Sequence, residues 1–537
     1  YEICACLVGS EMCIRDRFKL GFCYLFLCII CKKFTIVGGR RMLEIIFNRK
    51  CTEKCDVKVI GLAEKQSFCD SAFVKFLDKE ECRILHQAIK AENFTGKSGT
   101  WVDSYSAKGR LIAVGLGCRP QKLDLRKTGG RLVRRLSKNR VAKFWVGDVK
   151  GCRLSQEEIA HNVAFGMLLG SYRFDKYFTR KPAEDYPVLE KVYFDSAEKD
   201  KISLGDFVDM ASLANAVRYA RDLVNEPANF LTPEAFASDV ERLRYLKLDV
   251  EILDERELRK QDFNMLLEVA KGSEARPRVG VMIWHGDKRR KEMDAVLVGK
   301  GVTYDAGGIN LKDRKNLTNM YADMAGAAAV AATMKSIALE RRMVNVAAVV
   351  GLVENMPSGR ALHPFDVIRS MSGQTVEVTN TDGEGRLLLA DLLWYAQKRF
   401  EPARIIDIAT LTGTVAYALA GQYAGIFGND KKLIAALTES GAECGEPLWE
   451  LPLNDEFDKW IDSDVADMKN VGKDVGDGSQ AAAFLQRYIR KGVSWAHIDM
   501  ADMEIAGEDT ALCPKGATGF GVQLLNRYLR NLESEKK

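Results

Sequence analysis

The chain has 537 residues, of which 47% are hydrophobic and 28% are charged, and its net charge is +5 at pH 7. These values are typical of an ordinary soluble globular protein with two domains, and so small a net charge gives no indication of a nucleic-acid or membrane partner. Twelve of the fourteen cysteines precede residue 153, no CxxC…CxxC pattern is present, and the pair Cys51 and Cys55 lacks a second pair for a thiolate zinc site. We therefore expect reduced cysteines in a cytoplasmic protein.

The first 41 residues differ from the rest. Residues 20–31 form an apolar run of twelve with basic residues on both sides. This run is too short to span a bilayer but has the length of a signal-peptide core. The sequence starts with Tyr1, whereas Met42 directly precedes a strand-like segment, residues 43–47. We expect residues 1–41 to be a non-native extension, with a targeting peptide as the alternative.

Residues 42–205 alternate short β-type runs with helical spacing, which predicts a smaller N-terminal α/β domain. Strands are expected at residues 57–62, 111–116 and 142–146, and helices at residues 80–92 and 125–140.

The second of these helices, residues 125–140, is strongly basic. Its cationic side chains are Arg126, Lys127, Arg131, Arg134, Arg135, Lys138 and Arg140. One interpretation is a face that binds DNA. The favoured interpretation is a solvated outer face, because apolar residues at helical spacing can turn toward the sheet. Those inward residues are Leu132, Val133, Leu136 and Val141.

Residues 206–226 have a long helical pattern that Pro227 ends, and we expect this helix to link the two domains. Beyond it, Thr232 is the expected N-cap of a helix that begins at Pro233. Residues 227–537 then alternate strands with helices. Several strands are apolar throughout, as in a sheet covered on both faces, so this larger domain is predicted to be doubly wound α/β. Its expected strands are residues 248–253, 278–284, 295–299, 344–352 and 405–409.

The segment 380–387, Asn-Thr-Asp-Gly-Glu-Gly-Arg-Leu, follows a β-type run and precedes an apolar helical run. Turns at such strand ends commonly carry ligand sites in α/β sheets. Asp382 and Glu384 are two residues apart, so in an extended segment both side chains would leave the same side and reach one ion or ion pair. Without a cation, repulsion would force a proton onto at least one of them. For this pair alone, a solvated acidic turn is the competing interpretation.

A second charged and glycine-rich stretch follows the apolar residues 295–298. It contains Lys300, Asp305 and Lys312, and Asp323 follows eleven residues after the last of these. Taken singly, these lysines could cover apolar surface and these aspartates could cap helices or stabilise turns. Together they form a constellation that sequence proximity alone does not force together, and it is best considered jointly with segment 380–387.

The combined pattern resembles the leucyl (cytosol) aminopeptidase family, whose signature NTDAEGRL appears here with Gly383 in the alanine position. The resemblance continues through the runs VGKGVTYDAGG from residue 298, LVNEPAN from 223, DIATLTG from 407, SDVADMKN from 463 and GATGFGV from 516. It covers about residues 206–537 at the level of motifs. It implies a metal-dependent exopeptidase that removes the N-terminal residue of peptides, usually as a homohexamer.

The resemblance implies five metal ligands, Lys300, Asp305, Asp323, Asp382 and Glu384. Asp305 and Glu384 would bridge two divalent ions, Lys300 and Asp323 would complete one ion, and Asp382 would complete the other. Zn²⁺ or Mn²⁺ is expected, and the mostly oxygen donors also suit Co²⁺ or Mg²⁺. Lys300 can bind only as a neutral amine, so the ions must lower its pKa.

The other implied roles concern catalysis. Two ions can activate a shared water and hold both the free amine and the scissile carbonyl of a peptide. Lys312 would stabilise the oxyanion, and Arg386 would hold a bicarbonate ion bidentately as general base. An apolar pocket favours Leu-like first residues. The residues expected to contact substrate are Met320, Thr410, Leu411 and Gly413.

Other enzyme classes have little support, because the chain has no G-x-S-x-G elbow, no phosphate-binding GK[ST] loop and no convincing Cys/His pair. Two alternatives stay open. One is a dipeptidase of narrow specificity that uses the same metals. The other is DNA binding by residues 125–140, since some relatives also bind DNA, although we expect peptides as the main partner and no membrane partner.

Overall fold

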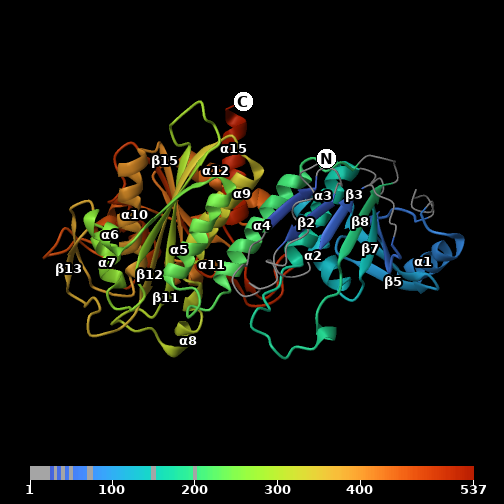
Figure 1. Ribbon diagram of the computed structural model, residues 1–537, viewed down its shortest axis with the longest axis horizontal. Coiled ribbons are helices and arrows are strands. Elements are labelled where there is room, and N and C mark those ends of the chain that lie inside the picture. Colours follow the sequence, from blue (N-terminus) through green and yellow to red (C-terminus); the bar gives the residue numbers. More distant parts are fainter. Residues whose placement is uncertain are drawn as a thin grey trace, which may run out of the picture. The chain divides into compact units, whose positions relative to one another are not determined.

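The computed structural model divides the chain into two compact units (Figure 1). One unit takes in the chain up to Ser171 and Thr179–Gly205, and the other takes in Tyr172–Phe178 and everything from Asp206 on. The residues that the structure describes are 24–28, 33–37, 43–47, 53–68, 76–146, 153–196 and 202–536. Most of the expected extension, residues 1–41, lies outside them, so its interpretation stays a prediction.

The first unit is built on a mixed sheet of eight strands in the order β1-β2-β3-β8-β7-β4-β6-β5. The five strands from β3 to β6 run parallel, and β1, β2 and β5 pair antiparallel at the two edges. The strands are β1 (Tyr24–Cys28), β2 (Lys33–Val37), β3 (Glu44–Phe47), β4 (Val57–Ala63), β5 (Trp101–Ser106), β6 (Gly109–Gly117), β7 (Val141–Val146) and β8 (Lys191–Ser196).

Every strand and helix predicted for this unit is confirmed, but the helix predicted at residues 125–140 is wrong at both ends. The helices are α1 (Lys79–Ala91), α2 (Lys122–Arg135), α3 (Gln156–Gly170) and the short 3₁₀ helix η3 (Ala183–Asp185). Helix α2 ends at Arg135 and not at residue 140, because the chain turns toward β7, with the Asn139 N–H donating to Leu136 O. The two strands β1 and β2 lie within residues 1–41, where the sequence analysis predicted no structure.

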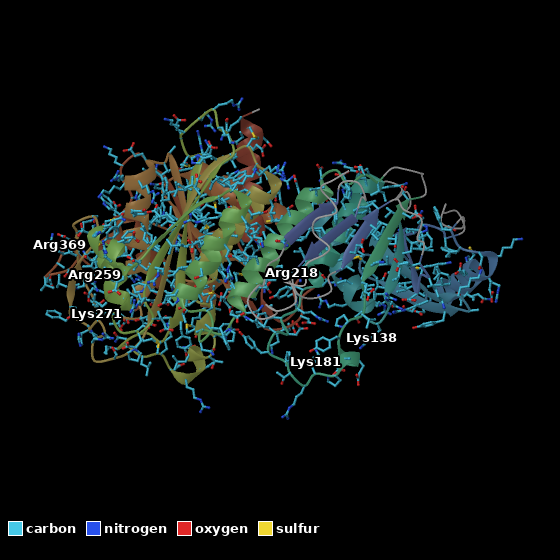
Figure 2. All side chains as sticks on the ribbon, viewed as in Figure 1. Lys138, Lys181, Arg218, Arg259, Lys271 and Arg369 are labelled. Carbon is cyan, nitrogen blue, oxygen red and sulfur yellow. The ribbon has the colours of Figure 1, made fainter. Side chains whose placement is uncertain are left out.

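The inward face predicted for α2 is confirmed, since Leu132, Val133, Leu136 and Val141 are all buried. Two of its arginines make contacts inside the unit. Arg126 Nε donates to Asn162 Oδ1 at 2.9 Å, and the Arg135 guanidinium lies 4.6 Å from the centre of the Trp101 ring. Lys138, just past the helix, is exposed (Figure 2). The helix therefore uses part of its positive charge for packing within its own unit.

The second unit contains a mixed eight-stranded sheet in the order β17-β16-β19-β15-β11-β12-β10-β9. The four central strands, β19, β15, β11 and β12, run parallel, while β10, β9 and β16 join antiparallel. The strands are β9 (Asp249–Leu253), β10 (Arg278–His285), β11 (Ala295–Asp305), β12 (Asn345–Asn355), β15 (Arg404–Ala409), β16 (Ala424–Gly428), β17 (Leu448–Glu450) and β19 (Ser494–Asp499).

Helices cover both faces of this sheet, as predicted for a doubly wound domain. Figure 1 shows β11, β12 and β15 in the middle of the unit, with α9 and α10 on either side of them. The main helices are α4 (Phe207–Val224), α5 (Pro233–Arg242), α6 (Glu255–Lys260), α7 (Asn264–Ala270), α9 (Ala325–Glu340), α10 (Glu384–Phe400), α12 (Lys431–Cys444), α14 (Asp477–Gln486) and α15 (Val522–Glu535). None of the helices among the described residues has the length and apolar character needed to cross a membrane.

Several local predictions in this unit are also confirmed. The helix expected at residues 206–226 is present as α4, and because it belongs to the second unit its role as a link stays a prediction. Thr232 caps α5 by accepting a hydrogen bond from Ala235 N–H at 3.3 Å. The short elements are η4 (Leu243–Leu246), α8 (Arg314–Leu317), η5 (Met320–Ala322), α11 (Gly413–Leu419), α13 (Asp455–Lys459), β20 (Ile505–Ala506) and β21 (Gly516–Ala517).

The strand before segment 380–387 is present but lies in a different sheet from the one expected. It is β14 (Thr375–Glu377), which pairs with β13 (Val367–Arg369) and β18 (Met468–Lys469) in a separate three-stranded sheet. The sequence pattern shows that a strand is present, but it does not say which strands are its partners. Segment 380–387 therefore follows a strand of the three-stranded sheet and not a strand of the eight-stranded sheet.

Asp391 shows how α10 organises its surroundings. Its side chain is fully buried and accepts the backbone N–H groups of Met265, Leu266 and Met371 at 2.9, 3.2 and 2.9 Å. Two of these donors belong to the first turn of α7, whose own N-cap residue, Phe263, makes no side-chain cap. One carboxylate therefore satisfies donors on two other segments.

We expect Asp391→Ala to destabilise the protein strongly, because it leaves three buried N–H groups unpaired at a cost of about 1–3 kcal/mol each. Asp391→Asn keeps a carbonyl acceptor and should lose less. Urea unfolding followed by circular dichroism measures both. An alanine variant as stable as the unchanged protein would contradict this account of the helix.

Candidate metal centre

Two of the predicted ligands lie on strand β11, not in a turn as the sequence suggested. Lys300 pairs with Gly351 of β12, and Asp305, the last residue of β11, pairs with Asn355. Residues five apart on a regular strand point to opposite faces. Here the register shifts between Val302 and Asp305, so that five residues of β11 match only four of β12. This bulge places the two side chains on the same face.

Glycines define which face that is. A Cβ atom on Gly299 would lie 2.7 Å from the backbone of α9, whereas one on Gly351 would lie 2.7 Å from a leucine side chain of α10. The two helices therefore cover opposite faces of β11 and β12. Lys300 follows Gly299 and pairs with Gly351, so it points toward α10. Gly385, in the first turn of α10, leaves room for it, because a Cβ there would lie 2.6 Å from Lys300 Cε.

The remaining carboxylates come from the start of α10 and from η5. Asp382 lies in a turn and Glu384 is the first residue of the helix, so the predicted extended conformation is wrong. Asp382 and Glu384 still meet, because one oxygen of each and one of Asp305 all lie within 4.8 Å of one another. Such a group of three could hold a metal ion. Asp323 directly follows η5.

Two lysines lie between these carboxylates. Lys300 Nζ is 2.8 Å from Asp323 Oδ1 and 2.9 Å from Glu384 Oε1. Lys312 Nζ is 2.8 Å from Asp305 Oδ2 and also contacts Asp382 Oδ1. The structure thus brings together all five predicted ligands and Lys312. They come from four separate segments of the chain, namely β11, the loop that contains Lys312, the end of η5 and the start of α10.

The charges in this site do not balance. Four carboxylates face two ammonium groups, which leaves an excess of two negative charges, and Lys300, Asp305, Asp323 and Glu384 are each at most 7% exposed. Burial, with repulsion between the carboxylates, raises the pKa of Asp323 and Glu384 and brings that of Asp382 to about 7. A bound cation would remove this repulsion.

The pKa values of the two lysines are raised as well, but for a different reason. Burial by itself would lower the pKa of Lys300 and Lys312, but the surrounding carboxylates outweigh it and raise both values. Both side chains are therefore charged in this arrangement. For Lys300 to bind a cation through its nitrogen, it must give up a proton to make a lone pair available.

A buried oxygen atom without a hydrogen-bond partner among the described residues shows that the residues of the site fit a metal ion. Asp323 Oδ2 is buried and has no hydrogen-bond partner among the described residues. An unpaired buried carboxylate oxygen costs free energy, and a divalent cation would satisfy it. The donor set of four carboxylates and one amine suits Mn²⁺, Zn²⁺, Co²⁺ or Mg²⁺. The residues present therefore fit a divalent-metal centre.

Two polar residues that the sequence analysis missed hold this arrangement in place. Asn355 Nδ2 donates to Asp305 Oδ1 at 2.9 Å and to Thr381 O at 3.1 Å. Thr381 Oγ1 donates to Gly307 O at 2.6 Å. Asn355 ends an apolar strand at the carboxyl edge of the sheet, where ligand sites form, and that position was a signal available in the sequence.

Arg386 lies in the first turn of α10 and is 3% exposed. Its Nη1 donates to Asn470 O at 2.9 Å, and its Nη2 donates to Asp477 Oδ1 at 2.6 Å. Its Nε is buried and has no hydrogen-bond partner among the described residues. The guanidinium is therefore fixed by two of its five N–H groups, and the Nε–H remains available as a donor.

The predicted substrate residues lie in different surroundings. Thr410 contacts two expected ligands, and Leu411 Cδ1 is only 2.9 Å from where a Cβ of Gly385 would lie. Gly413 is the exposed first residue of α11, and Met320 is the half-buried first residue of η5.

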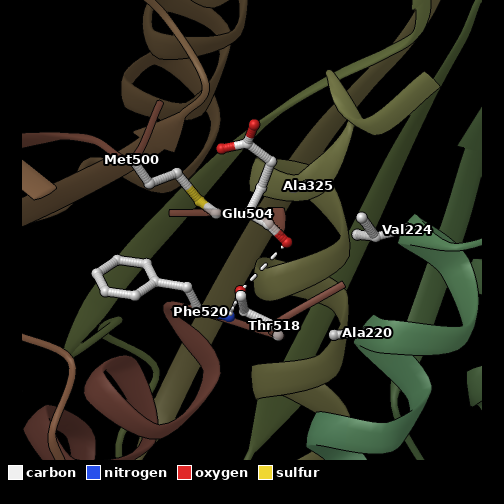
Figure 3. A pocket seen from close by; sticks show the side chains of 8 residues that line it. Ala220, Val224, Ala325, Met500, Glu504, Thr518 and Phe520 are labelled. Atoms are coloured by element: carbon white, nitrogen blue, oxygen red, sulfur yellow. Dashed lines mark hydrogen bonds between the residues drawn. The ribbon is translucent and has the colours of Figure 1, made fainter. Parts of the chain in front are cut away.

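A small pocket elsewhere in this unit is not the predicted substrate pocket. It is lined by residues of α4 and α9 and of the segments 500–504 and 518–520 (Figure 3). Neither Met320 nor any expected metal ligand lines it.

Known proteins give an independent comparison. Residues 218–526 match the model of the cytosol aminopeptidase family, catalytic domain, and residues 59–181 match that of its N-terminal domain. The chain is 42% identical to a probable cytosol aminopeptidase of Agrobacterium fabrum, covering 83% of this chain and 90% of that protein. It is 38% identical to one of Rickettsia bellii, covering 91% and 99%.

Solved structures agree. The bottromycin maturation enzyme BotP in complex with Mn is 32% identical, with a TM-score of 0.78, and the match covers 89% of this chain and 100% of that one. A mutant of tomato leucine aminopeptidase is 28% identical, with a TM-score of 0.80, over 92% and 97%. These matches over most of the chain show that it belongs to the cytosol aminopeptidase family and is a metallo-aminopeptidase.

Proposed function

We propose that this metallo-aminopeptidase removes Leu-like N-terminal residues from peptides at a centre of two divalent ions held by Lys300, Asp305, Asp323, Asp382 and Glu384. Zn²⁺ or Mn²⁺ is the proposed metal, with Co²⁺ or Mg²⁺ as substitutes. The excess negative charge of the four carboxylates around two lysines supports this proposal most directly. The similarity to a structure described as a complex with Mn gives further support.

The ions, when bound, would supply Lewis acidity and lower the pKa of a shared water. Lys312 would stabilise the negative charge that develops on the scissile carbonyl oxygen. Its contacts with Asp305 and Asp382 keep its amine charged, because they raise its pKa. A fixed cation in a mostly buried site needs little rearrangement during the reaction, which makes it effective.

Arg386 would hold a bicarbonate ion that takes a proton from the attacking water. Its unpaired and buried Nε supports an anion at this position. The bidentate binding expected from the sequence would need a second donor as well. A terminal nitrogen could provide it, because each carries two N–H groups and Nη2 donates one of its two to Asp477 at 2.6 Å.

Specificity, assembly and location belong to the same proposal. Leu411, beside Gly385, and Met320 would contact the first side chain of the peptide, with only modest discrimination among apolar residues.

The exposed aromatic residues Tyr417, Tyr423 and Trp449 support an oligomer, proposed as a homohexamer, because exposed apolar groups are commonly covered by partners. The proposed location is the cytoplasm. No observation favours the narrow dipeptidase or the DNA-binding alternative.

Removal of metal is expected to abolish the hydrolysis of leucine amide, and addition of Mn²⁺ or Zn²⁺ should restore it. Asp382→Ala should be inactive with either metal, because it removes one carboxylate of the group of three. Release of leucine by liquid chromatography and metal content by mass spectrometry measure the two effects. Full activity after exhaustive chelation, or in Asp382→Ala, would refute the scheme.

For Lys312→Ala we expect metal content to be retained while kcat falls by about 10²–10³-fold, the loss typical of one oxyanion donor. Stopped assays on leucine amide, with metal analysis of the same sample, measure both quantities. Loss of metal in this variant would show instead that Lys312 serves the structure of the centre.

Metal affinity is expected to fall as the pH is lowered. A carboxyl group binds a proton below its pKa, and the pKa of Asp382 is raised to about 7, so protons compete with the cation below that pH. The loss should approach about tenfold per pH unit for each proton displaced. Calorimetric titration of the apoenzyme with Mn²⁺ at pH 6, 7 and 8 measures this, and a pH-independent Kd would contradict it.

A further inference from the structure

Thr410, the residue after β15, contacts two of the expected ligands at once. Its carbonyl oxygen accepts a hydrogen bond from Lys300 Nζ at 2.8 Å, and its hydroxyl donates to Asp323 Oδ1 at 2.7 Å. Thr410 is 9% exposed, so little water competes for these bonds. A single residue thus joins the amine and the carboxylate that would complete the same ion.

The contact between Thr410 O and Lys300 Nζ differs in kind from the other two contacts that the Lys300 amine makes. The other two acceptors, Asp323 Oδ1 and Glu384 Oε1, are atoms of expected ligands. A neutral amine that binds a cation keeps only two N–H bonds, and its carboxylate neighbours then turn toward the same cation. The carbonyl of Thr410 is therefore the one acceptor that can stay in place. It limits the directions in which the lone pair of Lys300 can point.

The contact with Asp323 has a matching effect. The Thr410 hydroxyl holds Oδ1, while Oδ2 is buried without a hydrogen-bond partner. A carboxylate anchored at one oxygen presents the other in a fixed direction. The two bonds of Thr410 therefore orient both ligands toward one point.

The position of Thr410 is itself fixed from the neighbouring strand. Asp499, the fully buried last residue of β19, pairs in register with Ala409, directly before Thr410. Its Oδ1 accepts from Leu411 N–H at 3.0 Å and its Oδ2 from the Thr412 hydroxyl at 2.7 Å. Both residues that follow Thr410 are thus bound to one carboxylate.

We propose that Thr410 is a positioning residue of the metal centre, and that Asp499 acts through it by fixing the segment 410–412. This inference rests on the proposed two-metal function, because it assigns the supports of ligands named there. Removing a group that orients a ligand typically weakens metal binding about 10- to 100-fold. The fold need not change, since the segment keeps its other bonds.

The test is calorimetric titration of the metal-free full chain with Mn²⁺. Thr410→Val removes the hydroxyl at nearly constant volume and should raise the Kd of one ion by about 10- to 100-fold, whereas Thr410→Ser should restore binding. Thr333→Val is the matched control, because the buried Thr333 hydroxyl donates to Ala329 O at 2.8 Å in α9 and contacts no expected ligand. It should leave the Kd unchanged.

A second pair of variants tests Asp499. Asp499→Asn replaces an acceptor with an amide group that faces N–H and O–H donors, so the segment should loosen and Mn²⁺ binding should weaken. Asp407→Asn is the control, because Asp407 is equally buried on the adjacent strand and bonds Trp495 and His497 instead. It should change stability but not the Kd.

The outcomes separate the inference from the proposed function. If the unchanged protein binds neither Mn²⁺ nor, in a parallel titration, Zn²⁺, Co²⁺ or Mg²⁺, the two-metal function fails. If it binds Mn²⁺ and Thr410→Val binds equally tightly, the role of Thr410 fails while the function stands. Should Thr410→Val not fold, unchanged binding by Asp499→Asn would overturn the role of the segment, and weakened binding with an unaffected Asp407→Asn would support it.

Discussion

The repulsion among four carboxylates, three of them buried, is the constraint that governs the second unit. Asp305, Asp323, Asp382 and Glu384 meet in a site from which water is largely excluded, where like charges repel strongly. Two lysines offset only part of this charge. Such an arrangement is unfavourable for folding by itself, and its presence is what one expects of a site built for cations. The rest of the unit holds these groups together against their repulsion.

The backbone supplies that restraint in specific ways. The bulge near the end of β11 turns Lys300 and Asp305 to one face, and Gly385 leaves the space that the lysine occupies. Asn355 then links Asp305 to Thr381, so the end of β12 and the start of α10 cannot separate without losing hydrogen bonds in a buried site. Each ligand is therefore held by a rigid element or by a buried polar partner.

Helix α10 connects the expected metal ligands to Arg386, the residue proposed to bind an anion. Its first turn carries both Glu384 and Arg386, so their separation is fixed by helix geometry. Arg386 in turn binds Asp477 at the start of α14, and the next residue, Gly478, donates its N–H to Thr414 Oγ1 at 3.0 Å. The segment from Thr410 to α11 is thus hydrogen-bonded to the expected ligands Lys300 and Asp323 through Thr410, and to the start of α14 through Thr414. A movement of this segment would affect the ligands and the guanidinium together, which gives the unit one coupled site.

The sequence by itself determined the elements, the family and the identity of the clustered residues. Apolar periodicity predicted nine of the sixteen strands of the two main sheets, the Thr232 cap and the buried face of α2, because burial and local capping leave a direct trace in residue order. It could not assign β14 to a separate sheet, nor find the bulge that puts Lys300 and Asp305 on the same face. Strand partners and register depend on contacts between distant segments, which local patterns do not encode. For the same reason the supporting roles of Asn355, Thr381 and Asp499 became visible only in the tertiary structure, since their partners lie 26 to 88 residues away in the chain.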